Sequence, residues 1–274
     1  MKTQVILTCF AGRQANMEIG LQYTDKLYAQ GDIDEFHIWD FARDECDRIW
    51  LPSVAKNRPY IKFITSEKKL KWSDYYTYYT EGRFPNHVIV KIDDDIIFLD
   101  TKQFALYIQK TLQYQDECLM MFPSIVNNGV CAYYQQQHGY IPISVGEFPY
   151  DCFCGKLWDS GPLCQNLHSY FTNNWKDWIQ KSRDSNRLIV HQIGNRISIN
   201  FFAVTSKNLR IFELVQYRED EHVLSVEATA RYRKPLFIDE GFTVAHLTFC
   251  RQRETGADEP KIRDMYRKVL EENI

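Results

Sequence analysis

The sequence predicts an α/β fold in a single domain, with a mostly parallel, doubly wound central sheet flanked by helices. Two observations lead to this fold class. Short apolar runs alternate with segments of helical periodicity through the first hundred residues, and strands separated by helices in this way form parallel sheets. The chain of 274 residues also has the length of one large domain, and neither a repeat nor an obvious linker divides it.

Four short apolar runs are the expected parallel strands: Val5–Phe10, Phe36–Phe41, Tyr60–Thr65 and Val88–Ile92. The segments between them carry apolar residues at helical spacing, and the expected helices are Met17–Gln30, Asp44–Trp50 and Ser73–Thr80. The resulting alternation bears on function, because ligands of doubly wound sheets bind beyond the carboxyl ends of the strands.

The rest of the chain is less regular. We expect a helix at Thr101–Leu112, with Asp100 as its N-cap. Residues 138–170 are rich in Gly, Pro and aromatic residues and show little periodicity, so we interpret them as a long loop over the site. Three further strands and a terminal helix complete the pattern: Cys118–Phe122, Ile197–Val204, Phe242–Phe249 and Pro260–Asn273.

Composition excludes several classes of protein. A net charge of −3 does not suit a general nucleic-acid binder. The N-terminal segment does not have the pattern of a signal peptide, and no apolar run approaches the ~20 residues of a membrane helix. The eight cysteines are scattered, and Cys152, Cys154 and Cys164 match no zinc spacing. We therefore expect reduced thiols and a cytoplasmic location.

Residues 88–100, VIVKIDDDIIFLD, place three consecutive carboxylates between two apolar runs. Like charges so close together disfavour burial, so Asp93, Asp94 and Asp95 need either water or a cation. A solvated acidic turn is the simpler interpretation, but such turns rarely lie between two buried runs. Carboxylates at the end of a buried strand suit Mg²⁺ or Mn²⁺, which take oxygen ligands and leave positions open for phosphate.

This segment resembles the DxD segment of GT-A glycosyltransferases, which use nucleotide-sugar donors. The resemblance implies a metal-dependent enzyme that moves a sugar from a UDP- or GDP-sugar to a glycan or other hydroxyl acceptor, with Mn²⁺ or Mg²⁺ as cofactor. It also implies a nucleotide-sugar half at about residues 1–115 and an acceptor half at about 116–274. No nucleic-acid partner and no integral membrane segment are expected.

The resemblance also assigns roles to individual residues. It implies metal ligation by Asp95, Asp93 and His246, the last lying in the strand-like segment FTVAHLTF, where the alternative is a histidine of the core. Asp93 and Asp94 would also contact the donor. The first strand, its loop and the end of the second strand would bind the donor nucleotide through Thr8, Phe10, Gly12, Arg13, Asp40 and Arg43.

A late carboxylate often serves as catalytic base in inverting members of the resembled family. The segment REDEHVLS offers Asp220 and Glu221 for this role, with Asp220 preferred, and the alternative for both is helix capping. Asn127 and Asn128 follow the strand after the acidic segment and could bind acceptor, the alternative being an ordinary turn.

Two other functions remain open. A nucleotidyltransferase can share this fold and metal chemistry, although AGRQAN after the first strand has only one Gly and one Arg where a Gly-rich basic loop is typical. A non-catalytic glycan-binding protein on the same fold is the other alternative, and the intact carboxylates argue against it.

Overall fold

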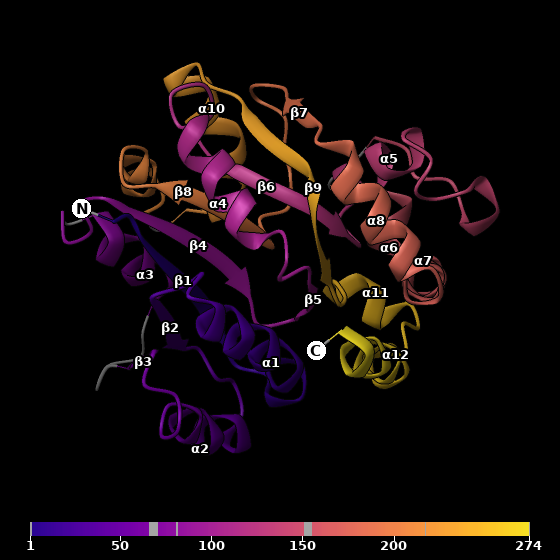
Figure 1. The fold of residues 1–274 in the computed structure, drawn as a ribbon, viewed down its shortest axis with the longest axis horizontal. Helices are drawn as coiled ribbons and strands as arrows, with labels where there is room; N and C mark the ends of the chain where they lie inside the picture. The colour runs from indigo at the N-terminus through magenta and orange to yellow at the C-terminus, as the bar shows by residue number, and fades with distance from the viewer. Residues whose placement is uncertain (1, 66–70, 81, 151–154, 217, 274) are drawn as a thin grey trace.

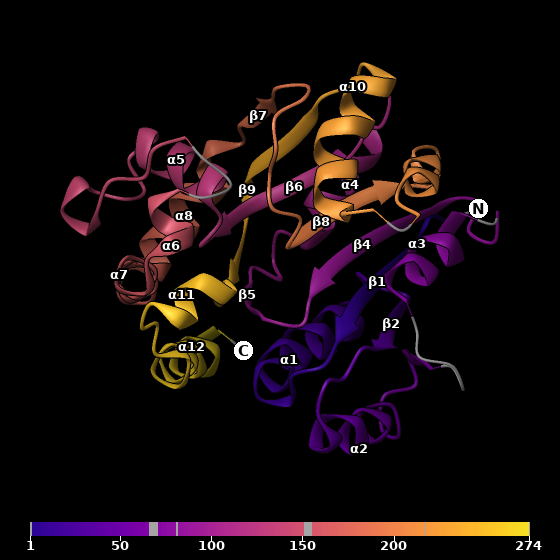
Figure 2. The same ribbon diagram turned by 180° about the vertical axis from the view of Figure 1, so that it is seen from behind.

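The fold was analysed in a computed structural model that describes residues 2–65, 71–80, 82–150, 155–216 and 218–273. Cys152 and Cys154 therefore lie outside the described residues. Figure 1 shows a central twisted sheet with helix α4 (Phe104–Gln113) on the face toward the viewer. Helix α10 (Ala228–Tyr232) covers the opposite face, which Figure 2 turns toward the viewer. The α/β fold class predicted from the sequence is confirmed.

The strands of the described chain form one nine-stranded sheet in the order β3-β2-β1-β4-β8-β6-β9-β5, and β7 pairs with β9. Strands β1 to β4 pair in parallel, as do β6 and β9, whereas β8, β5 and β7 run antiparallel to their neighbours. Their bounds are β1 Gln4–Ala11, β2 Glu35–Asp40, β3 Ile61–Ile64, β4 His87–Asp93, β5 Ile96–Leu99, β6 Met121–Val126, β7 Leu188–His191, β8 Phe201–Thr205 and β9 Leu236–His246.

Helices occupy most of the connections between these strands, the exceptions being β4–β5 and β7–β8. The remaining α-helices are α1 Gln14–Gln30, α2 Glu45–Val54, α3 Trp72–Thr80, α5 Gly129–Gln137, α6 Lys156–Asp159, α7 Gly161–Asn173, α8 Trp175–Ser185, α9 Asp220–His222, α11 Cys250–Glu254 and α12 Glu259–Asn273. Short 3-10 helices lie at Ile143–Val145 and Leu209–Leu214, and a π-helical turn at Val223–Glu227 follows α9 directly. Gly31 ends α1 with a φ of 75°, a left-handed conformation that favours glycine.

Two expectations from the sequence are wrong. The segment 138–170 is not one long loop, because α6 and most of α7 lie within it. Asp100 is not the N-cap of α4, which begins at Phe104; its carboxylate is instead paired with Arg183, whose Nε donates to Asp100 Oδ2 at 3.0 Å. A buried carboxylate needs a partner, and the guanidinium supplies it.

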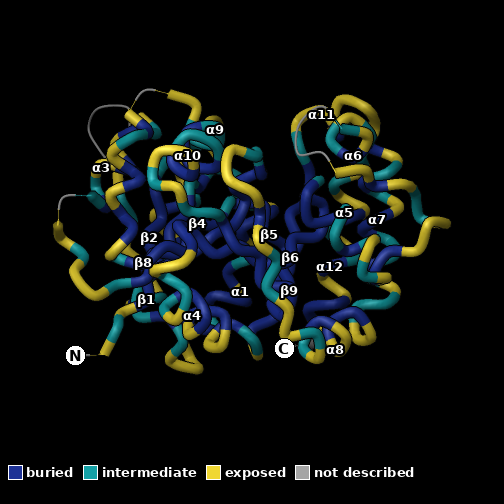
Figure 3. Tube along the Cα trace, turned by 90° about the horizontal axis from the view of Figure 1, so that it is seen from above, coloured by how far each residue is buried: buried dark blue, intermediate teal, exposed yellow. Residues whose placement is uncertain are grey.

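The core lies along the sheet, as the dark-blue centre of the tube in Figure 3 shows. Every residue of β5, β6 and β9 is buried, so these strands have helices or loops on both faces. At the β1–β3 side an aromatic cluster fills the space under α3, with Tyr75, Tyr76 and Tyr79 all fully buried. Among the helices that the structure describes, none is both long and apolar enough to cross a bilayer.

Candidate metal and donor site

The sheet topology gathers polar residues at one edge. Strands β1, β4, β6 and β9 run in the same direction, so their carboxyl ends share this edge, and antiparallel β8 begins there. Arg13 follows β1, Asp93 ends β4, His246 ends β9 and Asn200 precedes β8. This is the edge at which doubly wound sheets bind their ligands.

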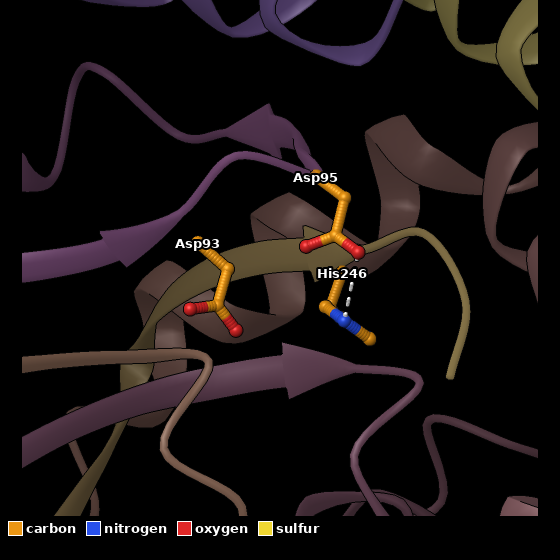
Figure 4. A group of neighbouring side chains, drawn as sticks. All are labelled: Asp93, Asp95 and His246. Atoms are coloured by element: carbon orange, nitrogen blue, oxygen red, sulfur yellow. Dashed lines mark ion pairs between the residues drawn. The ribbon is translucent and has the colours of Figure 1, made fainter. Parts of the chain in front are cut away.

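Asp93, Asp95 and His246 converge at this edge, as Figure 4 shows. One ligand atom from each residue lies within 4.8 Å of the other two. Asp95 and His246 are only 2% and 3% exposed, and His246 Nε2 lies 3.3 Å from Asp95 Oδ2. The backbone fixes the pair as well, because Leu247 N donates to the Asp95 carbonyl at 2.9 Å.

This group fits a divalent cation. Asp95 Oδ1 and His246 Nδ1 are both buried, and within the described part of the chain neither has a hydrogen-bond partner. A buried polar atom without a partner costs about 1–3 kcal/mol, and a bound ligand at Asp95 or His246 would compensate that cost. Carboxylate oxygens and an imidazole nitrogen together form a donor set suited to Mn²⁺, and the carboxylates alone suit Mg²⁺.

Arg13 resolves the charge conflict in the acidic triplet. Its Nε donates to Asp94 Oδ1 at 3.0 Å, and its Nη2 lies 2.9 Å from Asp95 Oδ2. Gly12 N also donates to Asp94 Oδ2 at 3.0 Å, so Asp94 ties the loop after β1 to the turn after β4. Burial opposes the ionisation of Asp95, but the charges of His246 and Arg13 outweigh it and hold the pKa of Asp95 below its usual range.

Asp93 is held by two residues that the sequence reasoning missed. Lys91 Nζ hydrogen-bonds Asp93 Oδ1 and also donates to the Ile199 carbonyl at 2.6 Å, while Asn200 Nδ2 donates to Asp93 Oδ2 at 3.2 Å. Burial alone would lower the pKa of Lys91, but the charges of Asp93 and Asp220 raise it above its ordinary value. Lys91 was foreseeable, since it lies two residues before Asp93 on one face of a strand.

Asn127 and Asn128 support the candidate metal group, which consists of Asp93, Asp95 and His246, from inside the protein. Asn127 Nδ2 donates to the Leu247 carbonyl, next to His246, at 2.9 Å. Asn128 Nδ2 donates to Asn200 Oδ1 at 3.3 Å. Asn128 thereby fixes the side-chain amide of Asn200, whose Nδ2 donates to Asp93. Both asparagines are fully buried, and their role in binding acceptor stays a prediction.

The remaining residues predicted to bind the donor lie around the carboxyl ends of β1 and β2. Thr8 is fully buried, and its hydroxyl accepts a hydrogen bond from Tyr79 of α3 at 2.8 Å. Phe10 is half-buried on the aromatic cluster under α3. Asp40 is half-buried at the end of β2, whereas Arg43 is exposed. Donor contacts of these four residues stay predictions.

The two candidate bases differ in their partners. Tyr76 of α3 donates its phenol hydrogen to Asp220 Oδ2 at 2.7 Å. Arg196 Nε donates to Glu221 Oε1 at 2.6 Å, and the same guanidinium pairs with Glu219. Burial raises the pKa of Glu221, and Arg196 opposes that shift. The charges of Asp93 and Asp220 both act on the buried Lys91 ammonium.

Sequence comparison finds no relative: no protein-family model and no curated protein matches this chain. Solved structures do resemble its fold. One is GalNAc-T7 with UDP, GalNAc and Mn²⁺, which is 11% identical, aligns over 89% of this chain and 43% of its own length, and gives a TM-score of 0.53. This chain thus spans less than half the length of that protein.

Two nucleotidyl-transferring enzymes also align with most of this chain. A 4-diphosphocytidyl-2C-methyl-D-erythritol synthase from Anaerococcus prevotii is 8% identical, covers 98% of this chain and 96% of its own, and has a TM-score of 0.44. A CMP:2-keto-3-deoxy-manno-octonic acid synthetase complexed with CTP is 8% identical, covers 100% of both chains, and has a TM-score of 0.47. At these identities the likeness to the solved structures concerns the fold alone.

Proposed function

We propose that this chain is a metal-dependent, inverting glycosyltransferase that moves a sugar from a UDP- or GDP-sugar to a glycan or other hydroxyl acceptor. The observation that carries the proposal is the convergence of Asp93, Asp95 and His246 at the carboxyl edge, where Asp95 and His246 each have one buried polar atom without a partner among the described residues. The DxD resemblance and the fold similarity to GalNAc-T7 support the same class of reaction.

The donor nucleotide would lie across the carboxyl ends of β1, β2 and β4, within reach of Phe10, Arg13, Asp40 and Arg43. Mn²⁺ or Mg²⁺ bound by Asp93, Asp95 and His246 would neutralise the diphosphate leaving group. Arg13 sits beside two of the carboxylates and would keep their side chains in place while the donor binds. The acceptor would approach from the half that follows residue 115.

Asp220 is the better candidate for the base, because Glu221 is already ion-paired with Arg196. As the acceptor oxygen attacks the anomeric carbon, Asp220 would take the hydroxyl proton, and the bond from that carbon to the phosphate oxygen would break. The nucleoside diphosphate leaves from the opposite face. One displacement of this kind inverts the configuration at the anomeric carbon.

The substitution Asp95→Asn tests the proposal, with binding of UDP- and GDP-sugars followed calorimetrically with and without Mn²⁺. We expect Mn²⁺ to lose its effect on donor binding in the variant, and sugar transfer to p-nitrophenyl glycosides to fall by roughly 100-fold or more. Residues that merely support metal ligands already cost 10- to 100-fold when changed, and Asp95 is proposed as a ligand itself. Asp264→Asn, on the exposed face of α12, is the control.

Other outcomes point to the alternatives. Pyrophosphate release from a nucleoside triphosphate, without sugar transfer, would identify a nucleotidyltransferase. Metal-dependent donor binding without turnover on any glycoside would identify a non-catalytic binding protein. Turnover close to wild type in Asp95→Asn would refute the metal assignment.

A further inference from the structure

We propose that Tyr76 is a positioning residue for the catalytic base, holding the Asp220 carboxylate in place from the donor half of the molecule. This inference rests on the proposed glycosyl transfer and deepens it. It assigns a role to a tyrosine that helical spacing alone places among the packing residues of α3.

The contact joins parts of the chain that are distant in sequence. Tyr76 OH donates to Asp220 Oδ2 at 2.7 Å across a separation of 144 residues. The phenol ring is fixed, because it is 1% exposed and packs against Phe212 and Tyr75 at ring-centroid distances of 5.0 and 4.8 Å. A buried ring of this kind cannot swing away, so its hydroxyl determines where the carboxylate points.

Asp220 is distinguished from its acidic neighbours by the nature of its partner. Glu219 and Glu221 both pair with the Arg196 guanidinium, whereas the salt bridges of the described residues include none to Asp220. A neutral hydroxyl orients a carboxylate without the full charge compensation of an ion pair. Among the described residues, the other oxygen of Asp220 accepts only from the neighbouring Glu221 N, at 2.9 Å, and keeps lone pairs for a proton.

Lys91 is a second rigid side chain at the carboxyl edge of the sheet. Its ammonium contacts Asp93 directly. Lys91 is 3% exposed, and its Nζ lies 5.8 Å from the centre of the Phe10 ring, so it too has little freedom to move. Tyr76 thus holds Asp220 from α3, while Lys91 holds Asp93 from β4.

Tyr76→Phe tests the inference, because it keeps the packed ring and removes only the hydroxyl. The readout is the ratio of sugar transfer to donor hydrolysis, measured with the UDP- or GDP-sugar and the p-nitrophenyl glycoside that the wild type turns over fastest. Hydrolysis uses the same donor and metal group but needs no acceptor held before the base. We expect transfer to fall on the order of 10-fold, while hydrolysis and the donor dissociation constant change less than about twofold.

The matched control is Tyr75→Phe, which removes a hydroxyl from the same buried cluster without touching Asp220. It should keep the wild-type ratio, and a lower amount of folded enzyme would leave the ratio unchanged in either variant. A double-mutant comparison adds an independent check: with Asp220→Asn already present, Tyr76→Phe should change transfer by less than about twofold.

Three results would overturn the positioning role while leaving the proposed function intact: a wild-type ratio in Tyr76→Phe, an equal loss in Tyr75→Phe, or full additivity with Asp220→Asn. Absence of sugar transfer by the wild-type chain with every donor and glycoside would instead refute the proposed function, and this inference with it.

Discussion

Three adjacent carboxylates are tolerated at the end of β4 because each has its own set of partners, although Asp94 and Asp95 share Arg13. Asp94 is paired with Arg13, Asp93 is held by Lys91 and Asn200, and Asp95 keeps an oxygen for a cation. The fixed cations compensate part of the negative charge, and the remaining charge is located where a metal would bind. Partners such as these decide whether a carboxylate is structural or a ligand.

Arg13→Met should lower the free energy of unfolding by about 2 kcal/mol at neutral pH, since it leaves Asp94 and Asp95 buried without their shared cation. Loss of one partner of a buried pair costs more than this, but the Arg13 side chain is 40% exposed, which weakens the effect. Urea denaturation would measure the loss. Arg43→Met removes an exposed arginine nearby and should stay within about 0.5 kcal/mol of wild type; equal losses would contradict the pairing.

Individual residues of the candidate site could be predicted from the sequence where a local sequence pattern pointed to them. The acidic triplet stood out between two apolar runs, and the family resemblance pointed to His246, which the structure brings within reach of Asp95. Asn200 and Tyr76 had no such mark, because their significance comes from partners more than a hundred positions away. Chain order carries little information about contacts of that kind.

At the scale of elements, the first four strands and three helices were predictable because their periodicity is regular. Helix α7 was missed because aromatic, Gly and Pro residues dominate its surroundings. A signal was nevertheless present: Ser160 caps the helix, its Oγ accepting from Leu163 N at 3.2 Å, and Pro162 lies in the first turn. A Ser-Gly-Pro start is compatible with a helix, since Pro is tolerated where the backbone N–H has no partner.

Helix α7 makes stability depend on pH through His168. This buried histidine hydrogen-bonds the Leu247 carbonyl at 2.7 Å and Tyr266 of α12 at 2.8 Å, and burial lowers its pKa to about 3. In the unfolded chain His168 takes up a proton near pH 6.5, whereas in the folded protein it stays neutral down to about pH 3. The contribution of neutral His168 to the free energy of unfolding is therefore complete above about pH 6.5 and is lost as the pH falls toward 3. We expect about 2 kcal/mol of this loss between pH 7 and pH 5.

Urea denaturation at the two pH values would measure this term. The difference in unfolding free energy between pH 7 and pH 5 should shrink in His168→Gln, which cannot gain the proton. His222→Gln, at a half-buried histidine that pairs with Glu227, serves as control and should keep the wild-type difference. An unchanged difference in His168→Gln would show that other groups account for the pH dependence.

At the scale of the whole molecule, the two halves of the chain share one sheet. Strand β4 of the first half pairs with β8 of the second, and β5 pairs with β9. The α/β class could be predicted from the alternation of strands and helices. The pairing of strands from the first half with strands from the second half could not be predicted, because pairing between strands remote in sequence leaves no local pattern. The division near residue 115 is thus a proposal about ligand binding rather than about folding units.

A fragment of residues 1–115 should accordingly fail to fold alone. It would expose the edge of β4 and leave β5, whose four residues are all buried in the intact chain, without its partner. We expect the fragment to aggregate or to lack protected amides in hydrogen exchange, whereas the full chain protects β4 and β9 together. A soluble fragment with slowly exchanging amides in β1 and β4 would contradict this view.

Only Asp94 and Asp95 separate β4 from β5, although three strands stand between these two in the sheet order. Ile96, the first residue after this tether, is the ladder partner of His246, so the two residues join Asp93 directly to the strand pair that carries His246. The reach of the backbone, rather than rotamer choice, sets how far apart Asp93 and His246 can be. An added residue in the tether would loosen the metal group even if every carboxylate were retained, so chain length is itself a component of the site.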